Sequence, residues 1–172
     1  RRDARGVISV GGVELSGEGG DTGFADWLLR QGDIEVHDAT LVWNDELRKA
    51  PQLELKKVFL QMYNQGGRHR FGLRAVPPGE LASPVEVRGD LVGETLKSLV
   101  DWNGRLYLRL DYVDIAAWRA WVPFPVELPR GSGAVRAWLS YSRHQLVDAI
   151  ADIKLANVRT RLASDLPELD LA

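Results

Sequence analysis

Three histidines are the first residues to consider for metal binding or general-base chemistry, and they lie in different segments of the chain: His37, His69 and His144. None belongs to an HxH, HxxxH or HExxH pattern, the spacings that bring two imidazoles to one metal ion. His37 precedes Asp38, but neighbouring side chains on a strand point to opposite faces, so the pair is a poor general base. His69 is in phase with apolar neighbours, as a packing residue is. We therefore predict no metal site and no catalytic histidine.

Other catalytic motifs are also missing from the sequence. It contains no cysteine, no GxSxG, no GxxxxGK[ST] and no GxGxxG. This excludes a thiolate nucleophile, the nucleophile elbow of a serine hydrolase, a P-loop and a dinucleotide-binding loop. Carboxylates cluster at Asn44–Glu46 and again at Asp165, Glu168 and Asp170, in segments typical of solvated turns. We expect a protein that is not an enzyme and that has no cofactor.

Charge and hydropathy narrow the class of partner. The 22 basic and 24 acidic residues give a net charge of -2 and no basic stripe, so we expect no nucleic-acid binding. No apolar run approaches the roughly 20 residues of a membrane helix, and the first residues, RRDARGVISVGG, lack the apolar region of a signal peptide. We expect any membrane anchor of the native protein to lie outside these 172 residues.

Strands are the main elements that must position the side chains. Alternating apolar and polar residues predict strands near 33–44, 52–63, 68–76, 84–92 and 104–112. Their short connections are typical of hairpins, which predicts an antiparallel sheet. The alternation slips by one residue at 37–40 and at 56–57, a pattern that indicates β-bulges and therefore a curved sheet.

Two short amphipathic helices interrupt the strands, one at 21–31 and one at 114–122. Asp21 or Thr22 can cap the first helix, and Asp114 can cap the second. The helices contain similar sequences, FADW and IAAW, which hints at an internal repeat of about 90 residues. We therefore divide the chain into the helix 21–31, a five-strand repeat at 32–112, the helix 114–122 and the start of a next repeat at 131–162.

A rough area estimate indicates that much of the sheet is not covered by helices. Seven strands at about 4.8 Å spacing present a face on the order of 800 Å², of which two short helices cover on the order of 300 Å². A large uncovered apolar face is unusual for a monomer. The sheet can curl into a barrel or sandwich, join neighbouring sheet, or hold an apolar ligand. The expected fold is mainly β, a curved antiparallel sheet forming a groove or open half-barrel.

The six tryptophans must also be placed. Stacked indoles can bind sugars, but Trp27, Trp118 and Trp121 lie on helix faces that have to dock, which favours the sheet edge or core. We expect these three at the rim of the groove or as its plug. The strand tryptophans, expected at sheet margins, are Trp43, Trp102 and Trp138.

Residues 24–78 resemble the bacterial YhdP family, within the AsmA-like group that also includes TamB. The resemblance rests on DWLL followed by GDIEVHDATLVWNDEL, LELKKVFLQMYN and GGRHRFGLRAVPP, and it extends through WNGRLYLRLDYVDIAAW. It implies a periplasmic protein of Gram-negative bacteria, anchored in the inner membrane by a helix outside this chain. It also implies a long hydrophobic groove, built of five-strand repeats, that carries phospholipid between the inner and outer membranes.

The predicted partners are phospholipid acyl chains, neighbouring repeats of the full-length protein and other envelope proteins. The candidate lining residues are Val58, Leu60, Met62, Phe71, Leu73, Val85, Val87, Leu106, Leu108, Leu110, Val135 and Leu139. The alternative is a structural or interaction module with a closed β core, which conducts no lipid.

Overall fold

One antiparallel sheet accounts for most of the structure, a computed structural model that describes residues 1–10, 13–14, 23–95, 101–121, 127–143, 145–161 and 169–171. Its long strands are β3 (Asp33–Trp43), β4 (Leu53–Gln65), β5 (Arg68–Val76), β6 (Val85–Val92), β7 (Asn103–Asp114), β8 (Glu127–Ser142) and β9 (Gln145–Arg161). The short β10 (Leu169–Leu171) pairs with β9, and β1 (Ser9–Val10) pairs with β2 (Val13–Glu14) in a separate ribbon.

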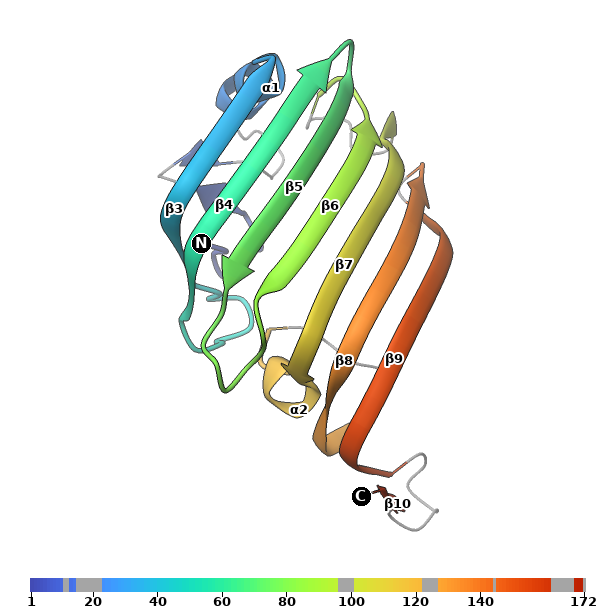
Figure 1. Cartoon of the computed structure of the whole chain (residues 1–172). Helices are drawn as coiled ribbons and strands as arrows, with labels where there is room; N and C mark the ends of the chain where they lie inside the picture. The colour runs from blue at the N-terminus through green and yellow to red at the C-terminus, as the bar shows by residue number, and fades with distance from the viewer. Residues whose placement is uncertain are drawn as a thin grey trace.

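The large sheet is open. Its strands follow chain order, so that β3 is at one end and β10 at the other (Figure 1). Every neighbouring pair is antiparallel, as hairpin connections require. This confirms the predicted mainly β, antiparallel sheet and excludes its closure into a barrel by the described strands. The five predicted strands match β3–β7 to within two residues at each end.

Both predicted bulges are present. The register of β3 against β4 shifts between Val36 and Ala39, where Asp38 has a φ of 52°. The register of β4 against β5 shifts between Lys56 and Phe59, where Lys57 has a φ of 49°. An extra residue in one strand bends that strand and increases its local twist, so the slipped alternation in the sequence marks where the sheet curves.

Two short helices lie at opposite ends of the strands, α1 (Gly23–Leu29) and α2 (Ile115–Trp118) (Figure 1). Beyond α1, the carbonyl of Gln31 accepts a 2.6 Å hydrogen bond from Asn64 Nδ2, near the end of β4. Beyond α2, the indole N–H of Trp121 donates to the carbonyl of Pro51, just before the start of β4, at 3.0 Å. These hydrogen bonds therefore attach the segments after the two helices to opposite ends of β4.

The cap predicted for α2 is confirmed, but the helix is shorter than expected. Asp114 Oδ1 accepts from the backbone N–H of Ala117 at 2.9 Å. After Trp118 the backbone continues with i→i−3 hydrogen bonds up to Trp121, which tighten the last turn and end the α-helix. The caps predicted for α1, at residues 21 and 22, lie outside the described residues.

The second set of strands begins before the predicted residue 131. β8 starts at Glu127. Five strands separate α1 from α2, as predicted, while the internal repeat itself remains a prediction.

Acidic residues in the β3–β4 loop were expected to be solvated, and for Asp45 this was wrong. Its side chain is buried because Arg2, from the distant N-terminal segment, forms a bidentate ion pair with it, and the backbone N–H of Arg48 donates to it at 3.1 Å. Burial raises the pKa of Asp45, but the hydrogen bonds from Arg2 and Arg48 outweigh burial and hold the pKa below its ordinary value. The pair fixes the N-terminal segment beside the end of β3.

The chain forms little enclosed core. Its accessible surface is 11394 Å², whereas a compact monomer of this length exposes about 8,400 Å². The buried apolar residues of the described part are few: Leu53, Val58, Ala75, Ala82, Trp102, Val113 and Ala137. Most apolar side chains of the sheet are thus only partly removed from water.

Candidate functional site

All twelve predicted lining residues lie on one face of the sheet, which we call the apolar face. Residues directly opposite each other on neighbouring strands share a face, so the register groups them into rows. Two rows are Leu60, Leu73, Val87 and Leu108, and Met62, Phe71, Leu106 and Leu139. The remaining four residues, Val58, Val85, Leu110 and Val135, continue the same alternation one step further along their strands, and Leu110 pairs with Val135. Each row crosses the strands from β4 to β7 or β8 without a charged residue. The alternation in the sequence therefore predicted which side chains share this face, and their role as a groove lining remains a prediction.

Within the described part of the chain, no layer of helices or strands covers most of the apolar face. Among the twelve residues only Val58 is buried, at 8% exposure, and the other eleven are half-buried. The face becomes more open toward β9, where its side chains at Leu146, Ile153 and Leu155 are 56–58% exposed. A closed core would bury these residues almost completely. The arrangement is that of an accessible apolar surface.

A glycine that the sequence reasoning missed shapes the middle of this face. Gly89 pairs with Phe71, and a Cβ built on Gly89 would clash with the Phe71 ring, 2.9 Å from Cδ1 and closer still to two other ring atoms. The phenyl ring therefore lies flat across Gly89 and fills the space of the missing side chain. Glycine carries no apolar signal in a sequence pattern, so only the strand register could reveal this contribution.

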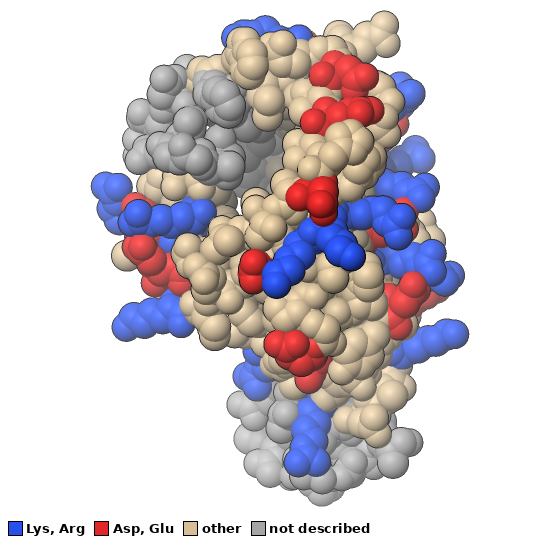
Figure 2. All heavy atoms as spheres, turned by 60° about the vertical axis from the view of Figure 1, so that its left-hand side comes forward, with Lys and Arg blue, Asp and Glu red and all other residues tan. Residues whose placement is uncertain are grey.

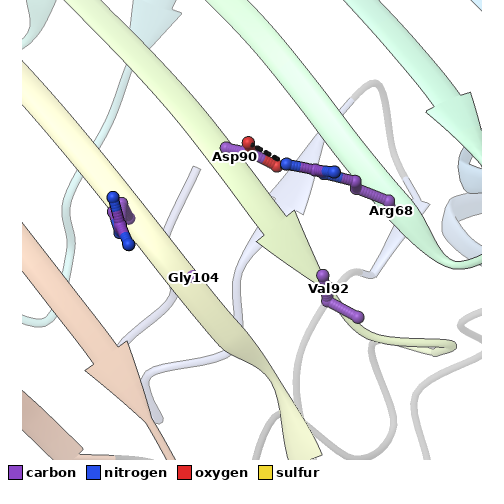
Figure 3. Close-up of a pocket in the computed structure, with 5 residues that line it drawn as sticks. Arg68, Asp90, Val92 and Gly104 are labelled. Carbon is purple, nitrogen blue, oxygen red and sulfur yellow. Dashed lines mark hydrogen bonds and ion pairs between the residues drawn. The ribbon is translucent and has the colours of Figure 1, made fainter.

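The opposite face is polar and its charges are largely neutralised. Arg68 and Asp90 form two 2.6 Å hydrogen bonds beside a pocket of about 330 Å³, and their side chains point toward one another in Figure 3. The hydrogen bond from Arg68 lowers the pKa of Asp90, so this carboxylate stays ionised and is a weak base. The hydrogen bonds from Arg109 likewise lower the pKa of Asp111. Figure 2 shows basic and acidic side chains interspersed rather than gathered into one patch.

Polar residues end the apolar face near α1. The ring of His69 is 4% exposed, with Nδ1 2.7 Å from Asn64 Oδ1 and Nε2 2.9 Å from the carbonyl oxygen of Gly93. Trp102 stacks on this ring at 5.2 Å and donates its indole N–H to the carbonyl of Thr95. Both imidazole nitrogens are engaged, which confirms His69 as a packing residue and places Trp102 at a sheet margin as predicted.

Tryptophans lie at both ends of the apolar face. The indole N–H of Trp118 donates to the carbonyl of Leu81 at 3.2 Å, and its ring meets that of Trp121 edge-on at 5.7 Å. At the α1 end, Trp27 is 49% exposed. The three helix tryptophans therefore lie at the ends of the strands, where a rim would be, and their contribution to binding remains a prediction.

Trp138 does not lie at a sheet margin, contrary to the sequence-based expectation. It occupies the middle of β8, on the polar face, and is 42% exposed. Its ring lies 5.4 Å from that of Tyr107, the residue directly opposite on β7. The contact between the two rings stabilises the pair across the strands, which explains why an indole can face solvent in the middle of a strand.

The described histidines are not gathered into a metal-binding cluster. His37 is exposed and its Nε2 contacts Glu35 at 2.9 Å, so its partner is not the neighbouring Asp38. In the part of the chain that the structure describes, no three His, Asp or Glu side chains come together as metal ligands. His144 lies outside the described residues. None of the described helices has the length and apolarity needed to cross a membrane.

Comparison with known proteins agrees with the geometry. The model of the YhdP protein family matches residues 1–172, the whole chain. The chain matches no curated protein and no solved structure. The family consists of bacterial envelope proteins of the AsmA-like, non-enzymatic type. The open antiparallel sheet with its uncovered apolar face is thus the architecture of a chain that belongs to the YhdP family.

Proposed function

We propose that this chain is one section of a lipid-transfer groove, which carries phospholipid acyl chains through the periplasm between the inner and outer membranes. The observation that carries the proposal is the apolar face, which runs across seven strands and is only half-buried. In an envelope protein, phospholipid is the abundant ligand whose chemistry matches such a surface. Headgroups would remain at the wet edge of the sheet.

The dimensions of the face suit an acyl chain. Seven strands at about 4.8 Å spacing span about 29 Å along the direction that crosses the strands. The hydrocarbon core of a bilayer, which contains two opposed acyl layers, is about 30 Å thick. One section is therefore long enough to bury the full length of an acyl chain. Each methylene removed from water contributes about 0.8 kcal/mol.

The same attraction permits movement. Burial of apolar surface is non-directional, so an acyl chain that leaves one row of side chains gains equivalent contacts with the next. We expect truncation of a single lining residue, such as Leu108→Ala, to change lipid binding little. Only an obstacle placed in the path, such as a charge, should stop a lipid.

The alternative is a module that only packs against other envelope proteins. The feature that favours it is the outward aromatic pair of Tyr107 and Trp138, next to Ile150, which is 57% exposed. Exposed aromatic residues are common at protein interfaces. This patch is on the polar face, so a protein contact there leaves the apolar face free and does not replace lipid binding.

The test is lipid extraction and mass spectrometry of the full-length protein that contains this chain, purified from bacterial envelopes in a detergent with short acyl chains. We expect phospholipid to remain bound at a fixed ratio to protein after extensive washing. A protein that is consistently free of lipid, although it is folded, would contradict the proposal and favour the interaction module.

A further inference from the structure

A polar pocket adjoins the apolar face at its α1 end. It has a volume of about 410 Å³, within the range of about 300–1,000 Å³ typical of small-molecule sites. It lies between the C-terminal end of α1, the β4–β5 hairpin and the segment that follows β6, and is lined by Leu29, Arg30, Asn64, Gln65, Gly66, Gly67, His69 and Glu94. We call it the α1 pocket.

The α1 pocket continues the apolar face by one row. Asn64 and His69 pair with each other across β4 and β5, two residues beyond the paired Met62 and Phe71. Two residues along a strand correspond to about 7 Å. An acyl chain that contacts Met62 and Phe71 therefore lies within reach of the pocket. Asn64 and His69 already bond to each other and to backbone carbonyls, so they form the wall of the pocket.

Two unpaired charges of opposite sign remain for a ligand. Arg30 and Glu94 both line the pocket and both are exposed. Within the described residues, neither side chain has an ion pair or a hydrogen bond, whereas Arg68, Arg109 and Asp90 on the polar face are all paired. A single cationic and a single anionic group at one polar opening are complementary to a zwitterion.

The hairpin glycine leaves room for the acidic group. Gly67 has a φ of +71°, and a Cβ built on it would lie 2.8 Å from Glu94 Oε1. Any side chain at this position would displace the carboxylate from its place beside the hairpin. Glu94 therefore lies close to the backbone of the turn, in the lining of the pocket.

We propose that the α1 pocket binds the zwitterionic headgroup of a phospholipid, with Arg30 contacting the phosphate and Glu94 contacting the ammonium group. The inference rests on the proposed lipid-binding function of the apolar face. An anionic headgroup without an ammonium group would satisfy Arg30 but would leave Glu94 facing negative charge. The pocket therefore discriminates between headgroups, whereas the apolar face binds the acyl chains.

The test compares the lipids retained by this chain and its variants. The protein is equilibrated with mixed vesicles of phosphatidylethanolamine and phosphatidylglycerol in equal amounts, re-isolated, and its bound lipids are quantified by mass spectrometry. We expect the wild type to be enriched in phosphatidylethanolamine. Glu94→Gln should lower the ratio of phosphatidylethanolamine to phosphatidylglycerol by about tenfold, the effect of one charge-assisted contact. Arg30→Gln should reduce the retention of both lipids.

Arg74→Gln is the matched control, because Arg74 is an exposed arginine on the polar face with no ion pair within the described residues. It should leave both the ratio and the amount of lipid unchanged. An unchanged ratio in Glu94→Gln, with lipid still bound, would overturn the headgroup site while leaving the apolar face as a lipid surface. Absence of lipid from the wild type would overturn both proposals. Unchanged thermal unfolding of all three variants excludes misfolding as the cause.

Discussion

Leu108→Glu should reduce the phospholipid bound to the purified protein by more than tenfold while leaving the sheet folded. Leu108 lies in the middle of the apolar face, opposite Val87, and is half-buried. A carboxylate pressed against an acyl chain loses hydration that nothing restores, at a cost of several kcal/mol, and each 1.4 kcal/mol is a factor of ten in binding. Folding should lose only about 1–2 kcal/mol, because the wild-type side chain is already partly in water.

The control for this variant is Tyr107→Glu. Tyr107 is the preceding residue of the same strand, it is half-buried, and it faces the polar side. Lipid mass spectrometry and circular dichroism of both variants separate the effects on binding and on folding. Global unfolding of Leu108→Glu would mean that the apolar face is a closed core. Equal loss of lipid in both variants would show that the face has no special part in binding.

Gly104→Ala should lower the free energy of unfolding by about 2–4 kcal/mol. Gly104 has a φ of +152°, which L side chains rarely adopt, and it pairs with Leu91 on β6. A Cβ at this position would lie 2.7 Å from the Cα of Leu91 and closer still to the carbonyl oxygen of Asp90. Because both obstacles are backbone atoms, β6 and β7 would have to separate locally. The melting temperature should fall on the order of 10 °C.

Gly72→Ala is the matched control for the glycine. Gly72 lies in the middle of β5, and a Cβ built there meets nothing within 4 Å. Alanine reduces the freedom of the unfolded chain, so this variant should be neutral or slightly stabilising. Thermal unfolding of the two variants provides the comparison. A similar destabilisation by both would mean that glycine flexibility, rather than the close approach at Gly104, sets the effect.

The strands and the apolar face could be predicted because both follow from a period of two. Each strand is bounded by a turn signal, and each bulge appears as a slip of one residue in the alternation. Lys57, for example, is one residue too many between Leu55 and Val58, and it has the positive φ of a bulge. The direction of each side chain in the central rows follows from this phase, so the sequence could predict which residues share the apolar face, while their contact with lipid remains a prediction.

Features that depend on partners distant in sequence could not be predicted. Asp45 looks like a loop carboxylate until Arg2, 43 residues earlier, is placed beside it. The same holds for the α1 pocket, whose charged residues Arg30 and Glu94 belong to different segments. The length of α2 was also overestimated, because an amphipathic pattern does not distinguish an α-helix from a helical turn followed by i→i−3 hydrogen bonds.

The most direct test of the central claim is photo-crosslinking from paired positions on the two faces of one strand. A benzophenone amino acid is placed at Leu73, on the apolar face, or at Arg74, the next residue, on the polar face. Cells with radiolabelled phospholipid are irradiated, and labelled protein is detected on a gel. Lipid adducts should form at Leu73 and not at Arg74. Adducts at both positions, or at neither, would contradict the proposal that phospholipid travels along the apolar face.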